Sequence, residues 1–166
     1  MKKPKKINEY FMGVFYVFIS FIILLGLVSI VFPMDLLNFV TSSTFRLASS
    51  FEEDHWFVNN TAEFCNYPNP TDQVRCVTLM VDTYYNYSIN RTANKNIQGT
   101  EEFLKNPSLC RDAVIMEDKI FRRLGWQTGF IFVPNHVYLS ISKKTSIGRL
   151  YYCEVDLPDF TCSRGI

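Results

Sequence analysis

Residues 108–125 read SLCRDAVIMEDKIFRRLG, and this stretch predicts the clearest helix in the C-terminal part of the chain. An acid in the first turn, Asp112, and two arginines in the last turn suit the helix dipole. Gly125 stands where the residue after a helix end is expected. We therefore predict a helix from Ser108 to Leu124. Its apolar residues recur at helical spacing and form one stripe, the expected core face: Leu109, Ala113, Met116, Ile120 and Leu124.

Cys110 falls in the first turn of this predicted helix. The first turn of a helix presents unpaired N–H groups and a positive potential, and both favour a thiolate over a thiol. The structural alternative for a free cysteine is a buried apolar thiol. The position of Cys110 favours a nucleophile instead.

Two runs rich in aromatic and β-branched residues follow, at residues 129–142 and 149–157, and they predict an antiparallel hairpin. If the turn of the hairpin centres on Ser146, His136 faces Asp156. Their Cβ atoms then lie roughly 5 Å apart, close enough for an imidazole–carboxylate hydrogen bond. A slip of the pairing by one residue would put the two side chains on different faces.

A cysteine at a helix start, a histidine on one strand and an aspartate on the next can act together. The thiolate attacks a carbonyl, the imidazole holds and then returns the proton, and the carboxylate orients the ring. We therefore predict Cys110, His136 and Asp156 as catalytic residues. The structural alternatives are a core thiol, a half-buried strand histidine and an acid that starts a turn.

The segments around these residues resemble the transglutaminase-like superfamily of papain-type cysteine enzymes. The resemblance covers about half of the chain, residues 71–158. The similar segments are LCRDA at residues 109–113, RLGW at 123–126, HVYL at 136–139 and VD at 155–156. The resemblance implies an α+β domain in which helices pack on an antiparallel sheet, and an acyl-transfer activity at amide bonds.

The chain departs from the family pattern at two places. Ser108 stands where members usually have glycine, two residues before the cysteine. Asp156-Leu157-Pro158 stands where members often have Asp-Pro-Thr. The donor that would stabilise the oxyanion is not apparent from the sequence, apart from the backbone N–H of Cys110.

The five cysteines suggest two disulfides and one free thiol. Cys65 and Cys76 are 11 residues apart, and Cys153 and Cys162 are 9 apart, so each pair can close a short loop. Such a bond stabilises by roughly 2–3 kcal/mol on the chain-entropy model. This pairing leaves Cys110 free, although spacing alone does not fix the connectivity.

The N-terminal third of the chain predicts a membrane anchor. Residues 10–34 contain no charged residue and are long enough to cross a bilayer as a helix. Four lysines in residues 1–9 predict a cytoplasmic tail, which places the C-terminal domain on the extracellular or lumenal side. A cleaved signal peptide is the competing interpretation, but its apolar region is usually shorter and ends at small residues.

Beyond the predicted anchor we expect a juxtamembrane connector at residues 35–58 and one transglutaminase-like domain at residues 59–166. Within the domain, residues 71–85 predict a helix capped by Thr71, and residues 101–105 predict a short turn of helix. The expected fold class is α+β.

Charge and composition limit the partners of this domain. The N-terminal tail takes four of the 17 basic and one of the 16 acidic residues, which leaves 13 basic and 15 acidic residues, a formal net charge of −2. This balance argues against nucleic acid as a partner. Three N-x-[ST] tripeptides start at Asn59, Asn86 and Asn90, all beyond the predicted anchor. No C-x-x-C pair occurs and the histidines are His55 and His136, so we expect no metal and no cofactor.

Two functions remain open. The first is a membrane-anchored cysteine protease, amidase or acyl transferase that acts on a protein or peptide substrate through a thioester on Cys110. The second is a catalytically inactive, membrane-tethered binding module or accessory subunit of a membrane complex. The lipid bilayer is the expected partner of the anchor in both, and membrane proteins are further candidate partners.

Overall fold

The structure, a computed structural model, describes residues 14–23, 33–51, 54–88, 97–145 and 148–164. The chain divides into two compact units, residues 1–41 and residues 42–166. One helix, α2 (Pro33–Ser50), contributes residues to both units.

The first unit contains the predicted membrane span, residues 10–34. Residues 14–23 are helical, and all of their large apolar side chains except that of Ile19 are exposed. Residues 10–13 and 24–32 of the predicted span, like the predicted cytoplasmic tail, lie outside the described residues. Among the helices that the structure describes, none combines the length and the apolar character needed to cross a bilayer.

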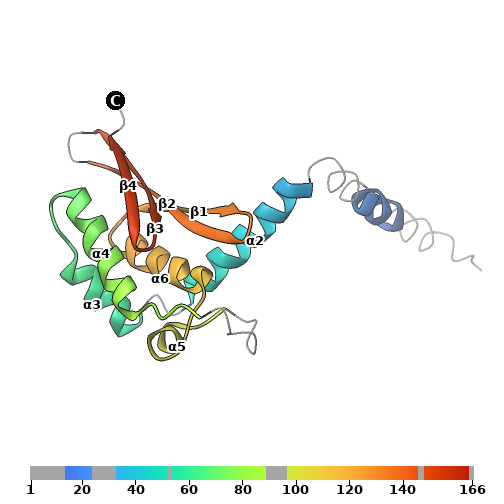
Figure 1. Ribbon diagram of the computed structural model, residues 1–166. Helices are drawn as coiled ribbons and strands as arrows, with labels where there is room; N and C mark the ends of the chain where they lie inside the picture. The colour runs from blue at the N-terminus through green and yellow to red at the C-terminus, as the bar shows by residue number, and fades with distance from the viewer. Residues whose placement is uncertain (1–13, 24–32, 52–53, 89–96, 146–147, 165–166) are drawn as a thin grey trace, which may run out of the picture. The chain divides into compact units, whose positions relative to one another are not determined.

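The second unit is an α+β fold, which confirms the predicted fold class. Helices lie on one side of a four-stranded antiparallel sheet whose strands follow their order in the chain (Figure 1). Besides the end of α2, the helices are α3 (Trp56–Phe64), α4 (Pro70–Tyr84), α5 (Thr100–Lys105) and α6 (Cys110–Arg123). The strands are β1 (Gln127–Val133), β2 (His136–Lys144), β3 (Leu150–Asp156) and β4 (Asp159–Arg164).

The run at residues 129–142, predicted as one strand, is two strands, and this prediction was wrong. The chain turns at Pro134 and Asn135, so that Val133 pairs with His136. Proline lacks the N–H that a central strand needs, and Asn135 has a φ of 64°, the left-handed conformation that tight hairpin turns require. The apolar pattern continues on both sides of this turn and hides its signal in the sequence.

The predicted hairpin between the second and third strands is present with a different register. Leu139 pairs with Val155, so the turn centres one residue later than Ser146. This difference moves every pair by two positions and therefore keeps each side chain on its predicted face. A further strand, β4, was not predicted; it pairs with β3 after a turn at residues 157–158.

The helix boundaries lie within two residues of the predicted ones, but the caps differ. Asn69, rather than Thr71, caps α4: its side chain accepts a hydrogen bond of 3.0 Å from the backbone N–H of Thr71. Pro70 then occupies the first position of the helix, where its missing N–H costs nothing. Gly125 follows the C-terminal end of α6 and has a φ of 80°, as expected for the residue after a helix end.

Helix α6 lies at the centre of the fold. All of its residues from Asp112 to Phe121 are buried, because helices cover one side of it and the sheet covers the other. The sheet contributes one set of alternating side chains to this core: Val137, Leu139, Ile141, Tyr151, Cys153 and Val155. The alternate residues of the same strands point away from α6.

The last turns of α2 are part of the domain. Phe45 is buried, and its ring meets the rings of Phe130 and Phe132 edge-on, at 5.4 Å between centroids in each case. Residues 42–50 were predicted to belong to a juxtamembrane connector, whereas in the structure they form one compact unit with the sheet and α6.

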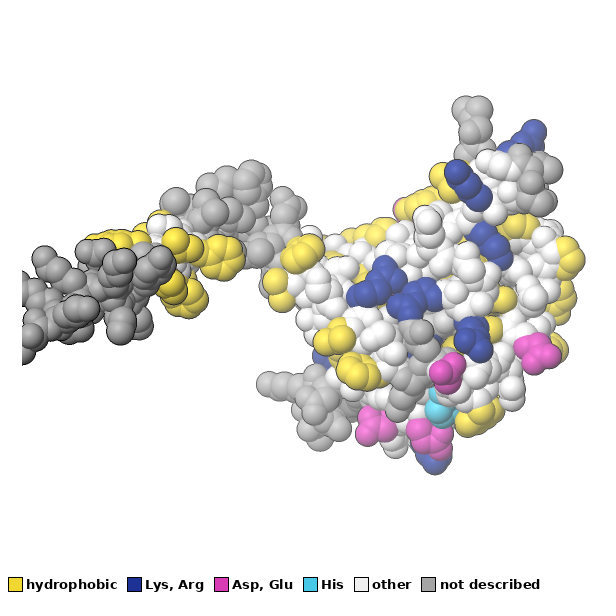
Figure 2. Space-filling view, turned by 180° about the vertical axis from the view of Figure 1, so that it is seen from behind, with side chains coloured by type: hydrophobic (Ala, Val, Ile, Leu, Met, Phe, Trp, Pro, Cys, Tyr) yellow, Lys and Arg dark blue, Asp and Glu magenta, His cyan; other side chains and the backbone are white. Residues whose placement is uncertain are grey.

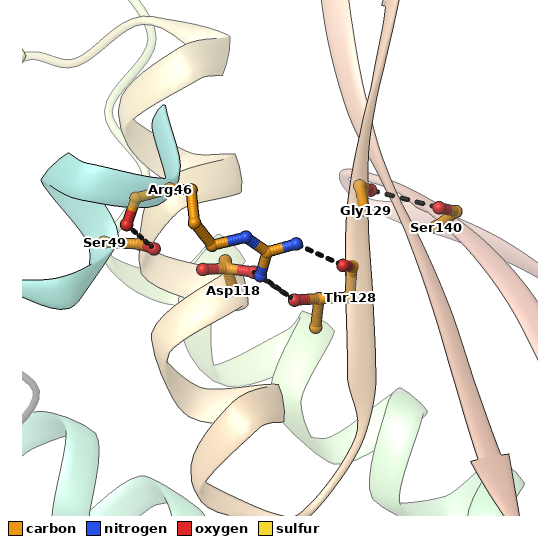
Figure 3. A network of polar contacts seen from close by, with 6 residues as sticks. All are labelled: Arg46, Ser49, Asp118, Thr128, Gly129 and Ser140. Atoms are coloured by element: carbon orange, nitrogen blue, oxygen red, sulfur yellow. Dashed lines mark hydrogen bonds and ion pairs between the residues drawn. The ribbon is translucent and has the colours of Figure 1, made fainter. Parts of the chain in front are cut away.

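A polar network joins α2 to α6 and β1 beside this aromatic cluster (Figure 3). Arg46 donates to Asp118 at 3.1 Å and to the hydroxyl of Thr128 at 2.6 Å. It also donates to the Thr128 carbonyl, and the Thr128 hydroxyl donates in turn to Asp118. The carboxyl of Asp118 is fully buried, so Arg46 supplies the charge that compensates it.

Basic side chains gather on one face of the molecule (Figure 2). Burial lowers the pKa of Arg122 on α6, and the charge of Arg46 on α2 lowers this pKa further. Arg46 and Arg122 are therefore near enough for their charges to interact, and the whole chain has a formal net charge of +1.

Candidate active site

The predicted nucleophile, Cys110, is the first residue of α6. Its thiol is free and partly exposed. The other four cysteines form the two predicted disulfides, Cys65–Cys76 and Cys153–Cys162, which confirms that pairing.

Asp112 holds the start of α6 in place. Its buried carboxylate accepts a hydrogen bond of 2.9 Å from the backbone N–H of Leu109 and one of 3.0 Å from that of Gln98. The aspartate thus ties the residue before Cys110 to a segment twelve residues upstream of it. The backbone around the thiol is fixed by these bonds.

A second segment, the chain that follows α4, also lies beside the start of α6. The N–H of Ser108 donates to the Asn86 carbonyl at 2.8 Å, and the N–H of Ser88 donates to the Ser108 carbonyl at 3.3 Å. Tyr87 and Ser108 consequently form a parallel β-bridge. The turn after α4 is therefore part of the surroundings of Cys110.

The predicted imidazole–carboxylate contact is present. His136 Nε2 lies 2.7 Å from Asp156 Oδ1, with about 38% and 54% of the two side chains exposed. The ring of Tyr138 stacks against that of His136, with centroids 6.4 Å apart. Because of the shifted register, the aspartate meets the histidine diagonally rather than face to face, a distance that long side chains can span.

The topology brings Cys110 to the end of the sheet that carries this pair. Helix α6 packs on β1 and β2, and residues 124–126 turn the chain back from α6 into β1. The helix has 14 residues and β1 has 7, which correspond to lengths of about 21 and 23 Å. The starts of α6 and β2 and the ends of β1 and β3 therefore lie at one end of the domain.

The three predicted residues are not all in contact. Within the part of the chain that the structure describes, the Cys110 sulfur makes no hydrogen bond to the His136 ring. Hydrogen bonds of a catalytic group are often long before substrate binds and shorten in the reacting complex. The His136–Asp156 pair belongs to the strand positions that point away from α6, whereas Cys110 begins α6 on the other side of the sheet. The geometry therefore joins two of the three groups directly, and the third shares with them only the end of the domain.

Tyr85 is a neighbour of the site that the sequence analysis missed. Burial raises the pKa of its phenol strongly. The negative charges that raise this pKa further are those of Cys110, Tyr87, Asp112 and Asp156. The phenol is thus within electrostatic reach of both the helix start and the end of β3. Its only signal in the sequence was its place at the end of the predicted helix 71–85.

Glu117 lies on α6, two turns after Cys110, and is an unusual core residue. Its side chain is fully buried, and neither carboxyl oxygen has a hydrogen-bond partner among the described residues. Burial raises its pKa well above the usual range, and the charges of Asp156 and Asp82 raise it further. The carboxyl is therefore neutral at pH values where an exposed glutamate is ionised.

His55, to which no function was assigned, caps α3: its Nδ1 accepts a hydrogen bond of 3.2 Å from the N–H of Phe57. In the described ranges, no group of three or more histidine, cysteine, aspartate or glutamate side chains is arranged to hold a metal ion.

Comparison of the chain with protein-family models, with curated proteins and with solved structures finds no match in any of the three. The resemblance to the transglutaminase-like superfamily therefore stays a prediction from the sequence.

Proposed function

We propose that this protein is a membrane-anchored, extracytoplasmic cysteine enzyme of the transglutaminase-like type, which acts on amide bonds of proteins or peptides through a thioester on Cys110. The observation that carries the proposal is the His136–Asp156 pair, with atoms 2.7 Å apart, at the end of the domain where α6 begins with a free cysteine.

In the first step, His136 accepts the thiol proton and the Cys110 sulfur attacks the amide carbonyl carbon. The tetrahedral intermediate then expels the amine, which takes the proton back from the imidazolium, and a thioester remains. In the second step, water or another amine attacks the thioester, and the thiol regains its proton. Asp156 keeps the imidazole in the orientation and tautomer that both steps need.

Two donors are available for the oxyanion that forms in each step. The backbone N–H of Cys110 is the generic one, since the first N–H groups of a helix have no partner within the helix. The phenol of Tyr85 is the second, because its hydroxyl can donate and the charges of both Cys110 and Asp156 act on it. Donors directed at a developing charge are usually the largest contribution to such reactions.

The membrane location rests on the sequence. The uncharged residues 10–34 have the length of a spanning helix, and the lysines before them favour a cytoplasmic N-terminus. The two disulfides fit a domain on the oxidising side of a membrane. Digestion of intact cells with a protease should therefore remove the C-terminal domain, and protection of the domain would overturn this orientation.

Alkylation of the full chain with iodoacetamide across a range of pH tests the activity. We expect Cys110 to react readily near pH 6, where an unassisted thiol is almost entirely protonated. His136→Ala and Asp156→Asn should slow this reaction, whereas His55→Ala, which changes a histidine outside the site, should not.

A Cys110 that resists alkylation in the folded protein would contradict an enzyme. It would instead favour the second candidate, a non-catalytic binding module or accessory subunit. An alkylation rate that is unaffected by His136→Ala would lead to the same conclusion, because the imidazole would then not contribute to the reactivity of the thiol.

A further inference from the structure

One side of the sheet is not covered by a helix. Val137, Leu139 and Ile141, which face the core from β2, are at most 5% exposed, whereas the residues between them are all half-buried. The same alternation continues on β3, where the even-numbered residues are exposed. We call this side the outer face and define it by six residues: Val133, Tyr138, Tyr152, Glu154, Asp156 and Asp159.

The outer face exposes flat aromatic side chains. Tyr138 lies against the His136 ring, and 36% of Tyr152 is exposed. The Tyr152 hydroxyl donates to Glu154 at 3.1 Å, which holds the phenol ring beside the carboxylate. At the end of β1, 42% of Val133 is exposed. Tyrosine-rich, uncovered surfaces of this kind are typical of protein interfaces.

The charges at the His136 end of the outer face are acidic. Glu154, Asp156 and Asp159 are all exposed, and Asp156 is the direct strand partner of Asp159. Among the described strand residues on this side, the only lysine or arginine is Lys144. It lies eight residues along β2 from His136, about 26 Å away at the rise of a strand.

Carboxylates next to exposed aromatic rings favour cations. Both the negative potential and contact with the face of a tyrosine ring stabilise a bound lysine or arginine side chain. The outer face is also continuous with the candidate active site, since Asp156 belongs to both. A bound chain would therefore run directly past the His136–Asp156 pair.

We propose that the outer face binds an extended polypeptide segment that carries lysine or arginine, with its cationic side chains over Tyr138 and Tyr152 and against Glu154 and Asp159. The choice of a polypeptide over a small amine rests on the proposed function, in which the site acts on peptide amides. The binding itself requires no thiol chemistry.

The test uses the full chain in detergent micelles and a short labelled peptide in which lysine alternates with serine, with fluorescence anisotropy as the readout. We expect the lysine peptide to bind, the binding to weaken as salt is added, and the matched glutamate peptide not to bind. The double variant Glu154→Gln/Asp159→Asn should weaken binding by about tenfold, as expected for the loss of two close charges.

Two further variants test the aromatic contribution and the location. Tyr138→Leu should weaken binding, whereas Tyr138→Phe, which keeps the ring, should retain it. The control Glu63→Gln/Glu102→Gln removes two exposed acids from α3 and α5 and should leave the affinity unchanged. An equal loss in this control would show that only the overall charge matters and would overturn the proposal.

Two competition results separate the alternatives. Free lysine or spermidine that competes at the same concentration as the peptide would show a site for small cations and would contradict a polypeptide ligand. Binding by Cys110→Ala should equal that of the unaltered chain. If alkylation shows an inert thiol but the lysine peptide still binds as described, the proposed catalysis fails and the binding surface stands.

Discussion

Arg46 on α2 donates a hydrogen bond of 3.1 Å to Asp118 on α6, and so joins two residues that are 72 positions apart in the chain. The acceptor carboxyl is fully buried, whereas about 40% of the arginine side chain remains exposed. The bond therefore links the end of the helix that follows the apolar segment to the helix that begins with Cys110. Both helices meet β1 at Thr128.

Arg46→Ala should destabilise the domain by about 2–3 kcal/mol, because it leaves the Asp118 charge buried and uncompensated. The exposure of the arginine reduces the loss below the value for a fully buried pair. Denaturant titration of the full chain in detergent measures the free energy of unfolding and so checks the expected loss of stability. Lys105→Ala removes an exposed ion pair with Glu101 and should leave the free energy of unfolding almost unchanged.

A chain that begins at residue 59 should fail to fold, whereas one that begins at residue 42 should retain the fold. The shorter chain lacks the Phe45 ring, the Arg46 network and the first turn of α3, including the buried Phe57. Loss of a single buried phenylalanine already costs about 3–5 kcal/mol, a large share of the stability of a small domain. Protection of backbone amides from hydrogen exchange distinguishes the two chains, and equal protection in both would show that residues 42–58 are only a connector.

Glu117 should make the domain less stable as the pH rises. Its pKa is raised in the folded state, so the folded protein keeps a proton that the unfolded chain releases above its ordinary pKa near 4.5. The stability contributed by the neutral carboxyl is complete below that value and is lost at up to about 1.4 kcal/mol per pH unit above it.

Glu117→Gln, which cannot ionise, should remove this slope. The variant should differ little from the unaltered chain at pH 4 and should be the more stable of the two at pH 8. Denaturant titrations at several pH values measure the difference. Glu102→Gln, at an exposed position, should leave the slope unchanged, and parallel curves for Glu117→Gln and the unaltered chain would refute a raised pKa.

Local patterns in the sequence were sufficient for the helices and for the short disulfide loops. Helical spacing, an acid near the start and a glycine after the end located α6 to within two residues. Cysteines 9 and 11 residues apart need little chain to close a loop, so their spacing favoured the observed pairing without fixing it. The His136–Asp156 contact also followed from a local feature, because the hairpin needs only the correct parity of its register.

The features that were missed depend on contacts between distant residues or on a single turn. Nothing near Phe45 indicates that its partners are Phe130 and Phe132, so the end of α2 was assigned to a connector. The neighbourhood of Tyr85 and Cys110 depends on backbone hydrogen bonds between residues about twenty positions apart. By contrast, the Pro134-Asn135 turn was available from the sequence and was overlooked within a continuous run of strand-forming residues.

The Tyr85 hydroxyl should stabilise an oxyanion without activating the thiol, and two reagents separate these effects. Acylation of Cys110 by p-nitrophenyl acetate passes through a tetrahedral intermediate with a negatively charged oxygen, whereas alkylation by iodoacetamide is a direct displacement that forms no oxyanion. Tyr85→Phe should therefore slow acylation by about 10²–10³-fold, the usual loss for one oxyanion donor, and leave alkylation nearly unchanged. Tyr87→Phe, which removes the hydroxyl of the neighbouring ring 6.0 Å away, serves as the matched control. Equal slowing of both reactions by Tyr85→Phe would mean that the phenol acts on the thiol itself, and no effect on either would exclude Tyr85 from the site.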